Sequence, residues 1–101
     1  MPNTSKQLFR GAATTTTTTT LYTTPAATTT VVTEIIASNT AASSATFTVY
    51  LNGTLVANTV TVAANDSTVI PMKQVLAATQ TVQGGASATT VNLHISGIEI
   101  A

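Results

Sequence analysis

The side chains that could do acid-base or nucleophilic chemistry are few and scattered along the chain. The sequence has one histidine, His94, one aspartate, Asp66, and no cysteine. A Ser-His-Asp arrangement needs a base that a third group orients, and no spacing in this sequence forms such a motif. His94 alternates with apolar residues in an extended stretch, so we interpret it as a polar side chain that faces solvent or another subunit. We therefore predict no catalytic residue and no enzyme activity.

Metal and cofactor sites are not indicated either. One histidine and three scattered carboxylates, Glu34, Asp66 and Glu99, do not form a ligand cluster with a recognisable spacing. Gly84-Gly85 lacks the strand, helix and lysine context of a phosphate-binding loop and is interpreted as a flexible turn. We predict no metal, no cofactor and no small-molecule substrate.

The composition restricts the class of partner. Only 6% of the residues are charged, three of them Lys or Arg, and the net charge is zero. Three cations cannot neutralise enough phosphates for nucleic-acid binding, and no apolar run approaches the roughly 18 residues of a membrane span. The N-terminus does not resemble a signal peptide, so we expect synthesis in the cytoplasm. Near-zero net charge removes the repulsion that keeps monomers apart, so we expect an assembly.

The elements that would position any site are strands, and the clearest signal lies between Ala45 and Val62. Large apolar residues from Phe47 to Leu51 alternate with hydroxyl-bearing residues, which is typical of a strand with one buried face. Asn52-Gly53 follows and suits the two positive φ angles of a type I′ turn. We predict a β-hairpin.

Breakers and alternation divide the rest of the chain into further short strands. The fold class predicted is all-β, an antiparallel β-sandwich or jelly-roll of about seven or eight strands. Residues 72–78 are interpreted as extended, although one helical turn is compatible with them. The predicted strands include one ending at Pro25, an inner strand at 28–38 covered on both faces, a short one at 67–70 ended by Pro71, one at 79–83 and a last one at 89–100.

The last predicted strand contains an irregularity. Its inward apolar residues occupy odd positions up to Ile95 but even positions from Ile98. One extra residue reverses the face of every later side chain, so this change predicts a β-bulge at Gly97.

The first part of the chain is interpreted separately. Residues 1–13 hold two of the three cations and show no sustained period, so we predict an extended N-terminal arm followed by a β-sandwich domain at 14–101. The alternative is that the arm packs on its own domain as an edge strand. The seven threonines Thr14–Thr20 suit extended geometry, and whether they form a strand or a linker stays open.

From Leu21 onward the order of features resembles small structural proteins of tailed bacteriophages. The resemblance covers about four-fifths of the chain and concerns short segments that specify architecture. These segments are LYTTPAATTTVV (21–32), ASNT (37–40), VTVAANDS (60–67), VLAATQTV (75–82) and SGIEI (96–100).

The resemblance implies a virion structural protein that assembles rather than catalyses. The expected function is that of a capsid decoration (cement) protein, a homotrimer on the capsid surface that binds the major capsid protein and stabilises contacts between its subunits. We expect the arm to contact another chain, with Leu8 and Phe9 as apolar anchors and Lys6 and Arg10 as rim contacts.

Two other interpretations of the sequence remain. A tail, neck or fibre component of the virion could use the same sandwich as an adaptor. A host-surface or carbohydrate-binding module is disfavoured, because the chain has no Trp and only two Tyr for stacking on sugars.

Overall fold

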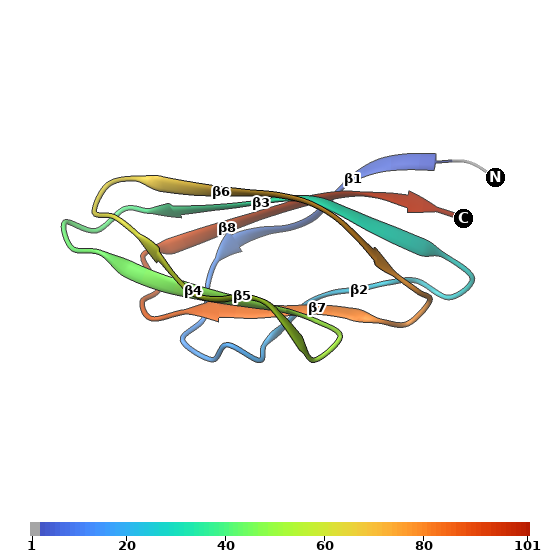
Figure 1. Ribbon diagram of the computed structural model, residues 1–101, viewed down its shortest axis with the longest axis horizontal. Helices are drawn as coiled ribbons and strands as arrows, with labels where there is room; N and C mark the ends of the chain where they lie inside the picture. Colours follow the sequence, from blue (N-terminus) through green and yellow to red (C-terminus); the bar gives the residue numbers. More distant parts are fainter. Residues whose placement is uncertain (1–2) are drawn as a thin grey trace.

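The computed structural model describes residues 3–101, which form eight β-strands in two antiparallel four-stranded sheets (Figure 1). One sheet has the strand order β1-β8-β3-β6 and the other β2-β7-β4-β5. The predicted antiparallel sandwich or jelly-roll of seven or eight strands is confirmed. The strands are β1 (Asn3–Ala12), β2 (Thr20–Thr23), β3 (Thr29–Asn39), β4 (Ala45–Leu51), β5 (Thr54–Val62), β6 (Ser67–Leu76), β7 (Thr81–Ala86) and β8 (Val91–Ile100).

The strand pairing is nested around the centre of the chain. β1 pairs with β8, β2 with β7, β3 with β6 and β4 with β5, all antiparallel. The chain therefore behaves as one long hairpin that wraps into two layers, which is the jelly-roll arrangement. Within residues 3–101 no helix is long and apolar enough to cross a membrane.

The tip of this wrapped hairpin is the predicted turn at Asn52-Gly53. Both residues have positive φ, 49° and 82°, as a type I′ turn requires. Leu51 pairs with Thr54 on either side of them, so the loop has two residues. The register of β4 and β5 then shifts twice, between Tyr50 and Val49 and between Val49 and Phe47, with the extra residues on β5. The predicted hairpin is confirmed.

The core lies between the two sheets and draws on nearly every strand. β3 is an inner strand, as predicted, with β8 on one side and β6 on the other. The largest fully buried side chains are Phe47, Ile35, Leu76, Leu93, Ile95, Val32, Val49, Val62, Val82 and Val91.

The predicted bulge at Gly97 is wrong in its position. β8 keeps regular alternation, and the extra residues lie on its two neighbours, between Gln7 and Phe9 of β1 and between Val32 and Glu34 of β3. Both irregularities lie beside Ser96 and Gly97. Gly97 is therefore buried, and the residue that follows it on the inward face is the carboxylate Glu99, not an isoleucine.

The irregularity in β3 also corrects the predicted faces of that strand. The sequence suggests that Val32 and Ile35 lie on opposite faces, each partly apolar. In the structure both are completely buried in the core. The extra residue, Thr33, restores them to one face, so the mixed pattern reflects a bulge and not a strand covered on both sides.

Thr14–Thr19 of the threonine run form a linker, Thr20 begins β2, and the Gly84-Gly85 pair is not a turn. Residues 14–19 connect β1 to β2, and backbone amides of Gly84 and Ala86 in β7 donate hydrogen bonds to carbonyls of this linker. A Cβ on Gly85 would lie 2.5 Å from the carbonyl oxygen of Thr16. The prediction of a turn at Gly84-Gly85 is wrong, because the linker approaches the β7 backbone too closely for a side chain.

Two other segments differ from the sequence interpretation. β6 does not end at Pro71 but continues to Leu76, which an edge strand allows because the missing N–H can face solvent. The extended interpretation of residues 72–76 is confirmed. Residues 3–12 of the predicted arm form β1, the edge strand paired with β8, so the alternative of an edge strand describes this segment. Residues 1–2 lie outside the described residues.

Candidate interaction surface

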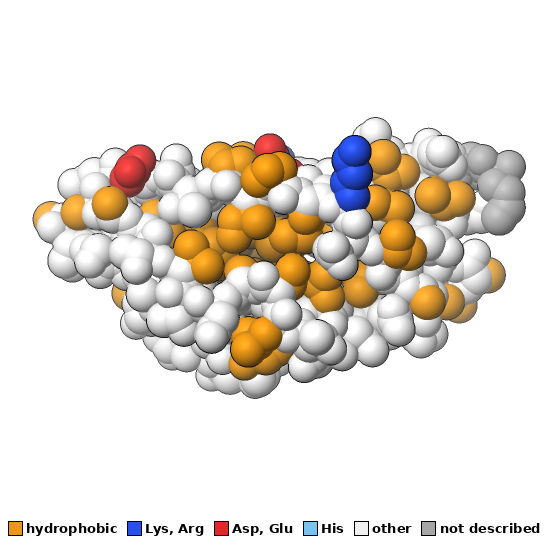
Figure 2. All heavy atoms as spheres, in the orientation of Figure 1, with side chains coloured by type: hydrophobic (Ala, Val, Ile, Leu, Met, Phe, Trp, Pro, Cys, Tyr) orange, Lys and Arg blue, Asp and Glu red, His pale blue; other side chains and the backbone are white. Residues whose placement is uncertain are grey.

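Exposed apolar side chains gather on one side of the sandwich. All four strongly exposed large hydrophobic residues within residues 3–101 belong to β5 or β6. These are the edge strands of the two sheets, and they lie side by side. Figure 2 shows a hydrophobic band between them. The residues and their exposed fractions are Leu55 (47%), Val56 (37%), Val69 (52%) and Val75 (65%).

A groove of about 300 Å³ lies on this side of the molecule. Leu55 and Val75 stand exposed on its two walls, and Leu76, only 2% exposed, connects it to the core. None of its lining residues is ionisable, so the groove offers apolar area, amides and hydroxyls. The complete lining is Leu51, Asn52, Thr54, Leu55, Val56, Gln74, Val75, Leu76 and Gln80.

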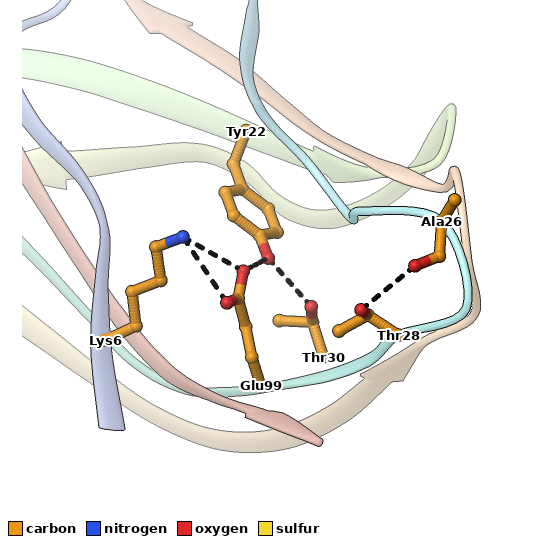
Figure 3. Close-up of polar contacts among 6 residues, drawn as sticks. All are labelled: Lys6, Tyr22, Ala26, Thr28, Thr30 and Glu99. Carbon is orange, nitrogen blue, oxygen red and sulfur yellow. Dashed lines mark hydrogen bonds and ion pairs between the residues drawn. The ribbon is translucent and has the colours of Figure 1, made fainter. Parts of the chain in front are cut away.

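The opposite side of the sandwich is joined by hydrogen bonds. The Tyr22 hydroxyl from β2 donates to the Glu99 carboxylate from β8, and Lys6 of β1 reaches the same carboxylate at 3.2 and 3.3 Å (Figure 3). The Thr30 hydroxyl lies 2.9 Å from the Tyr22 oxygen and donates to it, because the single phenol proton is given to Glu99. Three strands of one sheet are thereby tied to an edge strand of the other.

Both ionisable groups at the centre of this cluster have displaced pKa values. Burial, reinforced by the Glu99 carboxylate, raises the pKa of Tyr22 to about 12. The hydrogen bond from Tyr22, aided by Lys6, lowers the pKa of Glu99. At neutral pH the tyrosine is therefore protonated and the glutamate ionised. The hydrogen bonds and the ion pair of this cluster connect the two sheets.

The four residues predicted for the arm interface do not form one exposed surface. Leu8 is 7% exposed and packs in the core of its own chain, so it is not presented as an intermolecular anchor. Phe9 is half-buried against the same core. Lys6 pairs with Glu99, and Arg10 is exposed on β1 opposite His94. Contact of Lys6, Phe9 and Arg10 with another chain stays a prediction.

Leu8 is central to the position of β1 because of its place at the bulge. It is the extra residue between Gln7 and Phe9, and its side chain lies beside Gly97. A pattern search for alternation passes over this strand, because the bulge breaks the alternation at Leu8.

The sequence interpretation missed the β5–β6 side. A signal was present, because Leu55 and Val56 are consecutive apolar residues and regular alternation buries only one of two neighbours. In the structure Val56 is an extra residue relative to β4, and both side chains are exposed. On β6, Val69 and Val75 are both at odd positions and point to one face of the strand, whereas the buried Leu76 is at an even position and points to the other. Apolar residues on both parities of an edge strand are the observable sign of an exposed apolar face.

No metal site accompanies these features in the described part of the chain. No three His, Asp or Glu side chains of residues 3–101 lie close enough to hold an ion. No known protein family model matches the chain, and no curated protein matches it.

Proposed function

We propose that this protein is a virion structural protein of a tailed bacteriophage, a capsid decoration (cement) protein that binds the outer capsid surface. Its partners are the major capsid protein and further copies of itself, as a homotrimer. It needs no cofactor and carries out no catalysis in this role.

The observation that carries the proposal is the exposed apolar side at β5 and β6 on a surface that has few charges. A lone soluble domain gains nothing from four large exposed hydrophobic side chains on adjacent strand edges, whereas a lattice contact buries them. A jelly-roll is also an architecture used by capsid proteins. A cement protein acts by clamping neighbours through shape and buried area, and this surface suits that role.

Lys6 and Arg10 lie on the β1 side, opposite the β5–β6 side, so in this proposal they are rim contacts with a second neighbouring chain. Arg10 is exposed, and Lys6 is 45% exposed despite its ion pair. Truncating residues 2–13 is not a clean test of them, because it removes Leu8 from the core and leaves the β8 edge unpaired. Arg10→Ala keeps the strand and removes only the charged side chain.

The decisive measurement is the number of copies bound per particle. Purified protein is added to capsids assembled without it, and bound copies are counted by quantitative gel analysis and located by electron cryomicroscopy. A decoration protein saturates at hundreds of copies on the capsid shell. A handful of copies at the tail or neck would assign the alternative role, and no binding to any part of the particle would reject both.

A further inference from the structure

The turn at Asn52-Gly53 brings a reactive pair of groups to the surface. Asn52 is the one asparagine of the sequence that glycine follows, and both residues are exposed to water. A backbone amide nitrogen can attack the side-chain amide carbon of the asparagine before it, and glycine has no side chain to obstruct the attack. A Cβ built on Gly53 would meet nothing within 4 Å, so neighbouring atoms do not shield this position. The turn therefore presents the two groups that asparagine deamidation needs.

Hydrogen bonds to a third strand restrain the attacking nitrogen. The Gly53 N–H donates to Oε1 of Gln83 at 2.8 Å, and the Asn52 N–H donates to the carbonyl oxygen of Thr81 at 2.6 Å. Both acceptors belong to β7, an inner strand that lies between β2 and β4. The tip of the β4–β5 hairpin is thus bonded to a strand outside the hairpin.

We infer that Asn52 is a deamidation site and that Gln83 slows its conversion by holding the Gly53 N–H. The nitrogen attacks after it has lost its proton, and a hydrogen bond that a group donates stabilises the protonated form of that group. The bond to Gln83 must therefore break before the reaction begins, and its strength adds to the barrier.

The reaction needs only water as a co-reactant. The Gly53 nitrogen gives its proton to water or hydroxide and forms a bond to Cγ of Asn52, and the bond from Cγ to Nδ2 then breaks as ammonia leaves. Water opens the resulting cyclic imide at either carbonyl, so that the ring C–N bond breaks and the nitrogen regains a proton. The product at position 52 is an aspartyl or an isoaspartyl residue, which carries a carboxylate in place of the neutral amide.

Either product alters the β5–β6 side. Asn52 lines the groove there, and the lining has no ionisable side chain, so the new carboxylate introduces a charge. The isoaspartyl product also adds a backbone atom to a turn that requires the positive φ of Asn52, 49°. On the proposed function this side contacts the capsid, and deamidated protein is then expected to bind capsids more weakly. The inference itself concerns the turn and does not depend on that function.

The test follows the conversion in purified, folded protein kept in mildly alkaline buffer. Samples are digested with chymotrypsin, and mass spectrometry measures the fraction of position 52 that has become the acid. Gln83→Ala removes the acceptor and should speed the conversion about two- to tenfold, the rate factor that one neutral hydrogen bond supplies. Gln83→Glu retains an acceptor and gives it a charge, so its rate should equal or fall below that of the wild type. Equal rates in the wild type and Gln83→Ala, or faster conversion in Gln83→Glu, would overturn the inference.

Gln80→Ala is the matched control. Gln80 lines the same groove, but its Oε1 accepts from the backbone N–H of Ala77 and not from the hairpin. Its rate should equal that of the wild type, and acceleration as large as in Gln83→Ala would contradict a specific role of Gln83. In urea, the wild type and Gln83→Ala should convert at one common rate, faster than the folded wild type, because unfolding removes the bond from both. A folded wild type that converts as fast as the unfolded chain would show that the bond gives no protection.

Amide hydrogen exchange, measured by NMR, separates release of the turn from unfolding of the domain. In Gln83→Ala the Gly53 amide should exchange faster than in the wild type. The amide of Ile35, a completely buried residue of the inner strand β3, should be unchanged. Faster exchange at both positions would attribute the accelerated conversion to unfolding and would overturn the inference.

Discussion

The hydroxyl of Tyr22, in one sheet, donates a hydrogen bond to the carboxylate of Glu99, in the other. Lys6 and Thr30 complete the cluster, so the β1–β2 side of the sandwich is closed by polar contacts between the layers. The β5–β6 side has exposed apolar side chains and an uncharged groove instead. The two sides of the sandwich thus differ in chemistry: polar contacts join the sheets on the first, and exposed apolar side chains lie on the second.

Removing the Tyr22 hydroxyl should lower stability. Tyr22→Phe deletes the bonds to Glu99 and Thr30 and leaves a partly buried carboxylate with one partner fewer, which should cost about 1–3 kcal/mol in the free energy of unfolding. Urea denaturation at pH 7 measures it. Tyr50→Phe is the control, because the Tyr50 hydroxyl makes no hydrogen bond to other groups of residues 3–101. Equal losses in both variants would contradict the role of the cluster.

The same tyrosine predicts an alkaline dependence. Its pKa is about 12 in the folded protein and near 10 when unfolded, so the unfolded state releases this proton first. The stabilisation is therefore fully present below pH 10 and is lost as the pH rises towards 12. The difference in unfolding free energy between the wild type and Tyr22→Phe should shrink over that interval. A constant difference would show that Tyr22 titrates alike in both states.

Glu99 predicts the opposite dependence at acid pH. Its pKa is lowered in the folded state from an ordinary value of 4.5, so on acidification the unfolded state takes up the proton first. Its stabilisation is present above pH 4.5 and is lost as the pH falls through the folded value. Glu99→Gln should cost about 1 kcal/mol at pH 7 and much less in acid. Glu34→Gln is the control, since Glu34 forms no ion pair within residues 3–101, and a similar pH profile for both would contradict the prediction.

The central part of this fold could be predicted from local pattern. The Asn52-Gly53 turn and the alternation in β4 before it indicate a hairpin without any distant contact. The nested pairing of the outer strands could not be derived in this way, since it depends on contacts between residues far apart in sequence. The N-terminal strand illustrates the limit, because β1 is recognisable only through its pairing with β8.

Bulges and close approaches between backbone segments were the other features that the sequence pattern could not locate. The change of parity in the last strand was a correct observation, but a bulge in β8 and bulges in its neighbours leave similar patterns in the sequence. The Gly84-Gly85 pair resembles a turn unless one knows that the threonine linker lies against it. The candidate surface was missed because consecutive apolar residues such as Leu55 and Val56 have a meaning only once β5 is known to be an edge.

The close approach at Gly97 should make this position intolerant of any side chain. A Cβ there would clash with the carbonyl oxygen of Val31 and lie 2.9 Å from Cδ1 of Leu8. Gly97→Ala should therefore cost about 2–3 kcal/mol. Gly11→Ala is the matched control on the neighbouring strand, because its Cβ would meet only the Phe9 ring, at an ordinary 3.5 Å, and the change should stay within about 0.5 kcal/mol. Similar costs at the two glycines, measured by urea denaturation, would contradict the packing at the bulge.

A stabilising change is expected at Thr24, between β2 and β3. Its side chain is 1% exposed, and its hydroxyl is the buried side-chain group left without a hydrogen-bond partner within residues 3–101. Thr24→Val keeps the branched shape and removes the unsatisfied group, so it should raise the free energy of unfolding by about 1 kcal/mol and the melting temperature by roughly 4–8 °C. Thr30→Val is the matched control. Thr30 is equally buried, but its hydroxyl donates to Tyr22, so that variant should lose about 1 kcal/mol. If Thr24→Val were destabilising as well, the Thr24 hydroxyl would have a partner in solution such as a buried water, and the end of the sandwich at Pro25 would be hydrated.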